Sequence, residues 1–210
     1  MVNQWTTSGY TEQTDYLNPN KWSSPLIHHR EFARWVTESG CKKIVEIGCG
    51  NGRVLNALNL KNIKQYVGYD INNHFVKKAK EVWGKHDNVK FICANIEDVT
   101  DIEETDVVYI DSVLQMLENP YVTLRKLLNI TNCIMISRTR LTPGTYENKG
   151  KFKWGGMTEK ATNWEFSEEN MKEFALNNNA EIIREGLVTK FSVGLESGLW
   201  GIMSLIKNNN

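Results

Sequence analysis

The sequence of 210 residues predicts a doubly wound α/β fold, with a mainly parallel, seven-stranded sheet and helices on both of its faces. Three observations predict it. From residue 40 onward, short apolar runs alternate with amphipathic segments, which implies crossover connections and therefore parallel neighbouring strands. Two further strand-like runs close the chain, as an antiparallel pair at a sheet edge would. The chain is 40% hydrophobic, which is enough for a substantial core in one medium-sized domain.

The N-terminal segment is expected to form an arm followed by a helix. The first 25 residues are rich in Thr, Ser, Asn and aromatic residues, which indicates an irregular or partly helical arm. From Pro25 to about Ser39, apolar residues recur at near-helical spacing, with the proline near the first turn and Gly40 as the stop. This range therefore predicts a helix.

Five strands and three helices are expected next. The apolar runs predict strands at 43–47, 66–70, 89–93, 106–110 and 133–137. The amphipathic segments predict helices at 51–60, 75–83 and 121–128.

Residues 138–165 interrupt this rhythm. They contain Pro143, four glycines and two tryptophans without a clear period, so we expect a functional lid or a disordered segment. Ser167 is placed to cap a helix that runs to about Asn177. The runs at 180–189 and 199–206 predict the closing antiparallel pair.

Charge and cysteine content limit the classes of function. Lys plus Arg and Asp plus Glu are both 25, and this zero net charge argues against a nucleic-acid or acidic-membrane partner and favours a small or neutral substrate. The cysteines form no C-x-x-C pair and match no zinc pattern, so we expect no metal site and reduced thiols at Cys41, Cys49, Cys93 and Cys133. The N-terminus lacks an apolar signal region, and no apolar stretch approaches the ~18 residues that span a bilayer. We expect a cytoplasmic protein.

The most informative motif lies between the first strand and the following segment. It has the pattern E-x-G-x-G-x-G, beginning at Glu46, and alternate glycines let the backbone turn sharply and approach a ligand. The expected helix after it would offer free N–H groups to an anionic ligand. Asp70, at the end of the second strand, can accept both hydroxyl protons of a ribose. These features predict a nucleoside-binding site.

The same motif selects among nucleosides. A dinucleotide site has G-x-G-x-x-G, whereas Arg53 stands where its last glycine would be, which argues against a nicotinamide dehydrogenase. The carboxylate of Glu46 would repel a pyrophosphate but suit a cationic amine. The ligand should therefore carry an ammonium group as well as a ribose.

In these motifs, and over roughly Lys42 to Ser137, the chain resembles the class I S-adenosylmethionine-dependent methyltransferases. The resemblance implies a Rossmann-like methyltransferase fold and S-adenosylmethionine as cofactor. It implies that the glycines wrap the methionine part, that Glu46 helps to place its amino group, that Asp70 holds the ribose and that Ile71 packs on the adenine. The expected cofactor-binding residues are Glu46, Gly48, Cys49, Gly50, Gly52, Asp70, Ile71, Asn95, Ile96 and Asp111.

Two of these positions depart from a simple match. Asn95 stands where the family often has an aspartate that contacts the adenine edge, which leaves that polar contact open. Asp111 begins the loop that in the family faces both cofactor and substrate, and it could also merely cap the next helix. Many members have a histidine where Met116 stands, so no catalytic role is transferred to it. The resemblance divides the chain into an arm and cap helix at 1–40 and a methyltransferase domain at 41–210, with 138–165 as a lid-like insertion in a single globular domain.

No single residue is identified as the catalytic base. A hydroxyl acceptor would gain from one, and the candidates are His28, His29 and Asp111. Aromatic and polar residues of the arm and of the insertion are candidates for a substrate lid, namely Trp5, Tyr10, Tyr16, Trp22, Arg138, Arg140, Tyr146, Trp154 and Trp164.

The leading hypothesis is methyl transfer to a small-molecule acceptor, with oxygen slightly favoured over nitrogen. A nucleic-acid or protein methyltransferase is the first alternative, although the zero charge and the lack of an N-P-P-Y-like tetrad after the fourth strand argue against methylation of base amines. A cofactor-binding module without catalysis is the second alternative. The oligomeric state stays open.

Overall fold

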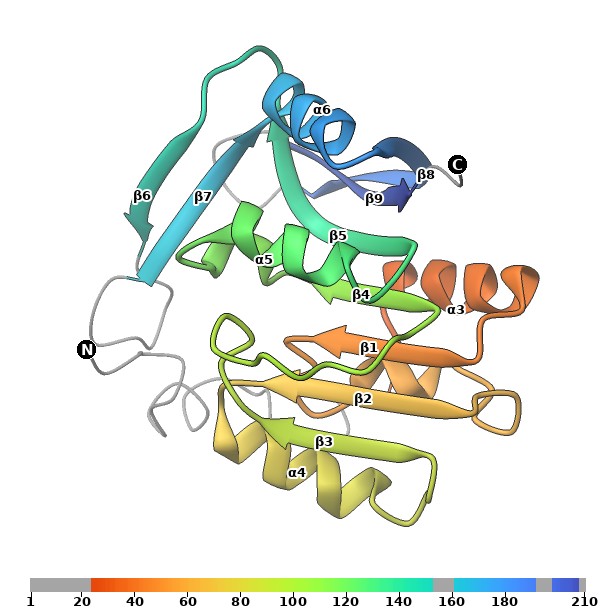
Figure 1. Cartoon of the computed structure of the whole chain (residues 1–210). Helices are drawn as coiled ribbons and strands as arrows, with labels where there is room; N and C mark the ends of the chain where they lie inside the picture. Colours follow the sequence, from red (N-terminus) through yellow and green to blue (C-terminus); the bar gives the residue numbers. More distant parts are fainter. Residues whose placement is uncertain (1–23, 153–160, 192–197, 208–210) are drawn as a thin grey trace.

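The computed structural model describes residues 24–152, 161–191 and 198–207, and within them nine strands make up one sheet, seven of which form the centre of the molecule (Figure 1). Its first five strands are parallel and lie in the order β3-β2-β1-β4-β5. Their bounds are Lys43–Ile47 for β1, Gln65–Asp70 for β2, Val89–Cys93 for β3, Val107–Asp111 for β4 and Cys133–Thr142 for β5. The expected bounds of β1 and β3 are confirmed, and the others differ by a residue at most, except that β5 is longer.

The sheet is completed by an antiparallel pair, as expected. β9 (Gly198–Lys207) runs antiparallel to β5, and β8 (Ala180–Phe191) pairs antiparallel with β9 at the edge. The predicted mainly parallel, seven-stranded sheet is therefore confirmed. Because β1 lies between β2 and β4, the strand order reverses there, and the carboxyl ends of these strands border a crevice.

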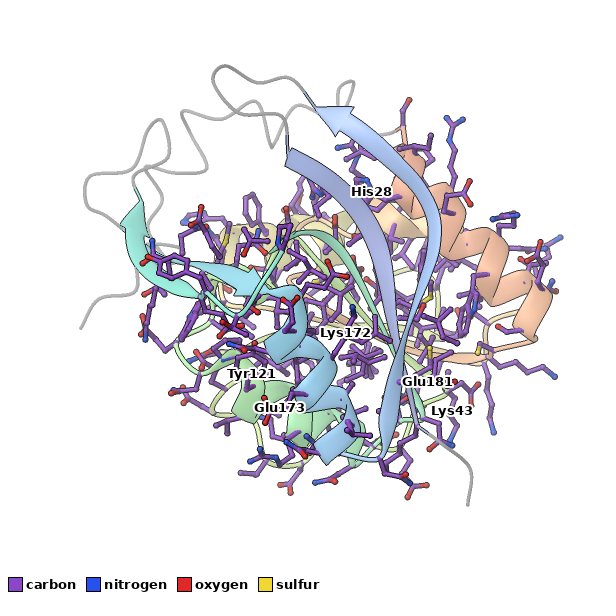
Figure 2. The ribbon with its side chains drawn as sticks, turned by 90° about the horizontal axis from the view of Figure 1, so that it is seen from above. His28, Lys43, Tyr121, Lys172, Glu173 and Glu181 are labelled. Carbon is purple, nitrogen blue, oxygen red and sulfur yellow. The ribbon has the colours of Figure 1, made fainter. Side chains whose placement is uncertain are left out.

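Helices cover both faces of the sheet, because neighbouring residues of each strand point to opposite sides. Ile44 packs in one hydrophobic cluster with α3 and α4, and Val45 packs in the other with α5 and α6. The bounds are Ile27–Ser39 for α3, Asn73–Trp83 for α4, Pro120–Leu128 for α5 and Glu168–Asn177 for α6. Figure 2, seen from above, shows α6 and β8 with Lys172, Glu173 and Glu181 labelled.

The helix ends follow the predicted capping. Gly40 ends α3 with a left-handed φ of 73°, and the side chain of Ser167 accepts a hydrogen bond from the backbone N–H of Asn170 at the start of α6. Within the described ranges, every helix is too short or too polar to cross a bilayer.

The helix predicted at 51–60 is wrong. Only one turn of 3-10 helix, η3 (Arg53–Asn56), forms there. Asparagine side chains compete with helical hydrogen bonds in this segment: Asn56 donates to the carbonyl of Arg53, and Asn59 accepts from the backbone N–H of Lys61. Residues 57–64 then lead to β2 without a further helix, so no α-helix begins at the glycine motif.

The segment 138–165 is more regular than its sequence indicates. β5 continues to Thr142, and β6 (Asn148–Phe152) and β7 (Ala161–Ser167) form a hairpin whose second strand joins β5 at Leu141 and Thr142. β6 has the sequence NKGKF, in which apolar and polar residues do not alternate. Its strand conformation therefore depends on pairing with β7 rather than on the burial of an apolar face.

The hairpin is attached to the loop between β4 and α5. The Nζ of Lys149 lies 2.8 Å from Oε2 of Glu118, and the hydroxyl of Thr162 donates a hydrogen bond to Oε1 of the same side chain. The indole N–H of Trp164 donates to the backbone carbonyl of Leu117 at 2.9 Å. The hairpin therefore positions residues 117 and 118, at the end of that loop.

Candidate functional site

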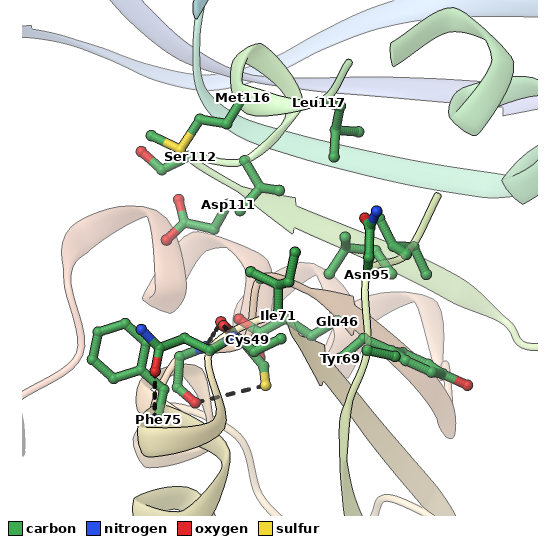
Figure 3. A pocket seen from close by; sticks show the side chains of 18 of the residues that line it. Glu46, Cys49, Tyr69, Ile71, Phe75, Asn95, Asp111, Ser112, Met116 and Leu117 are labelled. Atoms are coloured by element: carbon green, nitrogen blue, oxygen red, sulfur yellow. Dashed lines mark hydrogen bonds between the residues drawn. The ribbon is translucent and has the colours of Figure 1, made fainter. Parts of the chain in front are cut away.

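A cavity of about 290 Å³ opens at the carboxyl ends of β1, β2 and β4, where the strand order reverses (Figure 3). All but one of the expected cofactor-binding residues line it, namely Glu46, Gly48, Cys49, Gly50, Asp70, Ile71, Asn95, Ile96 and Asp111. The exception is Gly52. Its role lies in packing, since a Cβ atom there would lie 2.9 Å from Cδ1 of Trp83.

The glycine motif forms a tight turn against the end of β2. Gly48, Gly50 and Gly52 have φ angles of 74°, 54° and 77°, a conformation that side-chain-bearing residues rarely adopt. The backbone N–H groups of Gly48 and Cys49 both donate to the carbonyl of Tyr69, at 2.7 and 3.0 Å. The turn thus presents its backbone to the cavity without side chains in the way.

Asp70 links this turn to the end of β2. One carboxylate oxygen accepts from the backbone N–H of Gly50 and the other from that of Asn72, both at 2.8 Å. Burial raises the pKa of Asp70 to about 6, although these two hydrogen bonds favour the charged form. Each oxygen has a further lone pair, so the carboxylate can still accept a hydroxyl proton.

Glu46 is a buried carboxyl group at the end of β1. Burial raises its pKa well above the ordinary value, and the charges of Asp111 and Asp70 act in the same direction. The hydroxyl of Tyr66 donates a hydrogen bond to it and opposes this shift. A cationic group in the cavity would favour the ionised form of Glu46, because it would offset this repulsion.

The cavity also has apolar side chains in its lining. Ile71 and Ile96 line it, and Asn95 lies beside them. The side-chain amide of Asn95 donates to Asp98 at 3.1 Å and its oxygen accepts from the backbone N–H of Glu97 at 3.2 Å. These local bonds orient Asn95.

A polar cluster lies at the end of β4, around Asp111. Its Oδ1 accepts from the hydroxyl of Ser137 at 2.6 Å and from Nε of Arg138 at 2.8 Å. Its Oδ2 accepts from Nη2 of Arg138 at 2.7 Å and lies 3.1 Å from Nε2 of His29. Burial alone would raise the pKa of Asp111, but the nearby histidines and the Arg138 charge bring it well below its ordinary value. Because these side chains occupy both of its oxygens, Asp111 does not cap the short helix that follows β4.

His29 has a defined protonation state. The backbone N–H of Leu26, which precedes α3, donates to Nδ1 of His29 at 3.2 Å, as it would to a glutamate at this position of a capping box. Nδ1 therefore has no proton, and Nε2 has the proton and donates it to Asp111. Burial lowers the pKa of His29, so the ring is neutral.

Arg138 sits where β5 leaves β4. Its φ is 54°, unusual for a residue with a side chain, and the pairing of β5 with β9 shifts between Ser137 and Thr139. Such irregularities re-aim a side chain, and the guanidinium of Arg138 lines the cavity while it pairs with Asp111.

The sequence prediction for the acceptor side is met only in part. The three base candidates, His28, His29 and Asp111, lie together as one cluster. Of the lid candidates, Arg138 belongs to this cluster, Trp164 packs on Phe166 and the loop at Leu117, and the ring of Tyr146 is exposed. Trp5, Tyr10, Tyr16, Trp22, Trp154 and the side chain of Arg140 lie outside the described residues.

The sequence reasoning missed several residues that line the cavity. Arg53 lines it and donates from Nε to the carbonyl of Ser24. Phe75, Val113 and Leu117 also line it, and Figure 3 shows Phe75 and Ile71 on the opposite side from Asp111. Arg138 was named as a lid candidate, but its pairing with Asp111 was not expected.

The comparisons with known proteins agree with this geometry. The family model described as "Methyltransferase domain" matches residues 38–184. No curated protein sequence matches the chain. Among solved structures, the N-terminal domain of EvdMO1 with SAH bound superposes with a TM-score of 0.67 and 15% identity, over 86% of this chain and 81% of that one.

Two further solved structures are similar over most of the chain. Magnesium protoporphyrin IX methyltransferase (ChlM) from Synechocystis PCC 6803 with bound SAM has a TM-score of 0.63 and 14% identity, over 97% of this chain and 93% of that one. The CcbJ methyltransferase from Streptomyces caelestis has a TM-score of 0.63 and 14% identity, over 90% and 92%. At these identities the likeness shows the shared fold.

Proposed function

The chain belongs to the methyltransferase family and is an S-adenosylmethionine-dependent methyltransferase, and from this premise we propose that it methylates a small-molecule acceptor at oxygen. The observation that supports the proposal most is the polar cluster of His29, Asp111 and Arg138, which lines the same cavity as Asp70.

The residues of the cavity fit the cofactor. S-adenosylmethionine, when bound, supplies an electrophilic methyl group on a sulfonium. We propose that Asp70 accepts the ribose hydroxyls and that Glu46 holds the cationic amino group, since its buried carboxyl is ionised most readily beside a cation. The backbone turn at Gly48 and Gly50 would surround the methionine part. Ile71, Ile96 and Asn95 would contact the adenine.

The burial of the polar cluster supports a small acceptor. The side chain of His29 is 3% exposed and that of Asp111 is 7% exposed, so the acceptor atom must enter the cavity to reach them. The zero net charge gives no general attraction for a nucleic acid. Oxygen is favoured because a hydroxyl gains from a nearby proton acceptor, and a further histidine, His28, lies 3.3 Å from Asp111, whereas an amine needs less help.

The test uses the whole chain, methyl-labelled S-adenosylmethionine and a cell lysate that has been divided into small-molecule and macromolecular fractions. We expect label to appear in a small molecule, and mass spectrometry to place the methyl group on oxygen. The Asp70→Ala variant should transfer little label, because it lacks the ribose acceptor. Transfer to RNA or protein alone would contradict the proposal.

We also propose that residues 41–210 act as one methyltransferase domain with an N-terminal arm and cap helix at 1–40. A cytoplasmic location is proposed on the cysteines, since Cys41, Cys49, Cys93 and Cys133 are all free thiols.

A further inference from the structure

We propose that His28 is the general base of this enzyme and that the acceptor group is a hydroxyl, whose proton His28 takes on Nδ1 while its Nε2 faces Asp111. The inference rests on the proposed function. It follows from how the nitrogen and oxygen atoms of the polar cluster are already used, because only one of the three base candidates keeps a ring nitrogen for a new proton.

Asp111 is unsuited to accept a proton. Ser137 and Arg138 donate to its Oδ1, and Arg138 and His29 donate to its Oδ2. A carboxylate with so many donors is stabilised as the anion, and its pKa lies well below the ordinary value. Its suitable role is to position its neighbours and to stabilise a cation beside it.

His29 is also unsuited, since both of its ring nitrogens are engaged. Nδ1 accepts from the backbone N–H of Leu26, and Nε2 donates to Asp111. To accept a proton on Nδ1, the ring would have to break the contact with Leu26 at the first turn of α3. Burial further disfavours the charged ring.

His28 is differently placed, at the start of α3 (Figure 2). Its Nε2 lies 3.3 Å from Oδ2 of Asp111, is fully buried and makes no hydrogen bond within the described residues. The side chain as a whole is 12% exposed, so the exposure belongs to the remainder of the side chain, which includes Nδ1. The ring packs edge-on against His29, which lines the cavity, at a centroid distance of 4.4 Å.

The Asp111 carboxylate, 3.3 Å away, favours the tautomer of His28 that has its proton on Nε2. A proton on Nε2 of His28 faces the Asp111 carboxylate, which leaves the lone pair on Nδ1 to accept the proton of an acceptor. A second proton makes the ring cationic, and Asp111 at 3.3 Å stabilises that charge. In the described part of the chain, Asp111 and His29 face His28, and Arg138 pairs with the same Asp111 carboxylate.

The alternative use of the same atoms is a metal site. One ligand atom each of His28, His29 and Asp111 lies within 4.8 Å of the others. A metal on Nε2 of His29 would require a proton on Nδ1, because a metal-bound neutral imidazole donates from its other nitrogen. The N–H of Leu26 points at that nitrogen and excludes this proton. The guanidinium of Arg138 also occupies both oxygens of Asp111 and would repel a cation.

The proposed step balances as follows. The O–H bond of the acceptor breaks, and its proton goes to Nδ1 of His28. The acceptor oxygen uses its freed electron pair to bond the methyl carbon, which leaves the electron pair of the broken carbon–sulfur bond on the thioether product. The imidazolium of His28 then releases its proton to water. No oxidant or further reactant is needed.

The kinetic test compares the native enzyme with His28→Gln, using a hydroxyl acceptor found in the labelling experiment. We expect kcat to fall by about 10²- to 10⁴-fold, with the Kd for S-adenosylhomocysteine unchanged. His86→Gln, in the loop after α4, serves as the matched control and should behave as the native enzyme. A His28→Gln rate within about threefold of native would overturn the proposal.

A second test needs no acceptor. Nitrogen NMR of the whole chain with S-adenosylhomocysteine should show His28 protonated on Nε2 in its neutral form, and adding zinc chloride should leave both histidine rings unchanged. A proton on Nδ1, or zinc shifts of both rings, would overturn the proposal. If the native enzyme methylates no hydroxyl compound, the proposed O-methylation fails. The NMR measurement of the His28 tautomer is independent of that result, so the two failures can be distinguished.

Discussion

Binding of S-adenosylhomocysteine should weaken as the pH falls through 6, because the carboxylate of Asp70 is the proposed acceptor for the ribose hydroxyls. The pKa of Asp70 is raised to about 6 by burial. The charged form therefore predominates above pH 6, and the neutral form, which accepts hydroxyl protons less well, predominates below it. At pH 5 only about a tenth of the groups are ionised, so Kd should be about tenfold higher than on the plateau above pH 7.

Titration calorimetry between pH 5 and pH 8 measures this dependence. Asp70→Asn should bind weakly with a flat profile over the same range, whereas Asp87→Asn, in an exposed loop, should keep the native profile. Glu46 is the second carboxyl group in the cavity whose pKa burial raises, and Glu46→Gln measures its separate contribution to the pH dependence of Kd. A native affinity that stays constant from pH 5 to pH 7, or an Asp70→Asn variant that keeps the native slope, would refute the reasoning.

Three further predictions concern stability and reactivity. Gly52→Ala should cost at least about 2 kcal/mol of unfolding free energy, since it adds a clash with an indole carbon at 2.9 Å to the strain of a φ of 77°. Gly40→Ala, with a φ of 73° and nothing within 4 Å, should cost only about 1 kcal/mol, and equal losses in urea titrations would contradict the argument. Tyr66→Phe should cost about 1–3 kcal/mol, because the buried carboxyl of Glu46 loses a donor; an unchanged thermal midpoint would show that this bond contributes nothing. Cys93, the most exposed thiol, should react with a disulfide reagent in the folded protein, and Cys93→Ser should remove most of this reaction.

Local patterns in the sequence were sufficient for most of the sheet. The runs at 43–47 and 89–93 coincide with β1 and β3. β1 is buried over most of its length, and β3, at the sheet edge, still carries enough apolar residues to be found. The helix expected at 51–60 failed for a reason that the sequence contains, since Asn56 and Asn59 bond to nearby backbone groups. The β6–β7 hairpin has no comparable signal, as its strands are fixed by each other and by Glu118.

The cofactor side of the site was more predictable than the acceptor side. Glu46, Gly48 and Asp70 each follow or end a strand at one sheet edge, so their meeting can be inferred from the order of strands. The contact between His29 and Asp111 joins residues 82 positions apart, and it depends on how α3 packs across the sheet. Spacing alone contains no information about that packing, nor about the left-handed backbone that turns Arg138 into the cavity.

The hydrogen bond from Leu26 to His29 ties the chemistry of the site to the integrity of a helix end. Helix termini commonly fray, and in most proteins this motion leaves the remainder of the molecule unaffected. Here, each opening of the first turn of α3 would free Nδ1 of His29 and allow its proton to change nitrogen, which would withdraw one donor from Asp111. Substitutions that loosen this turn should therefore alter catalysis without touching any group that contacts cofactor or acceptor.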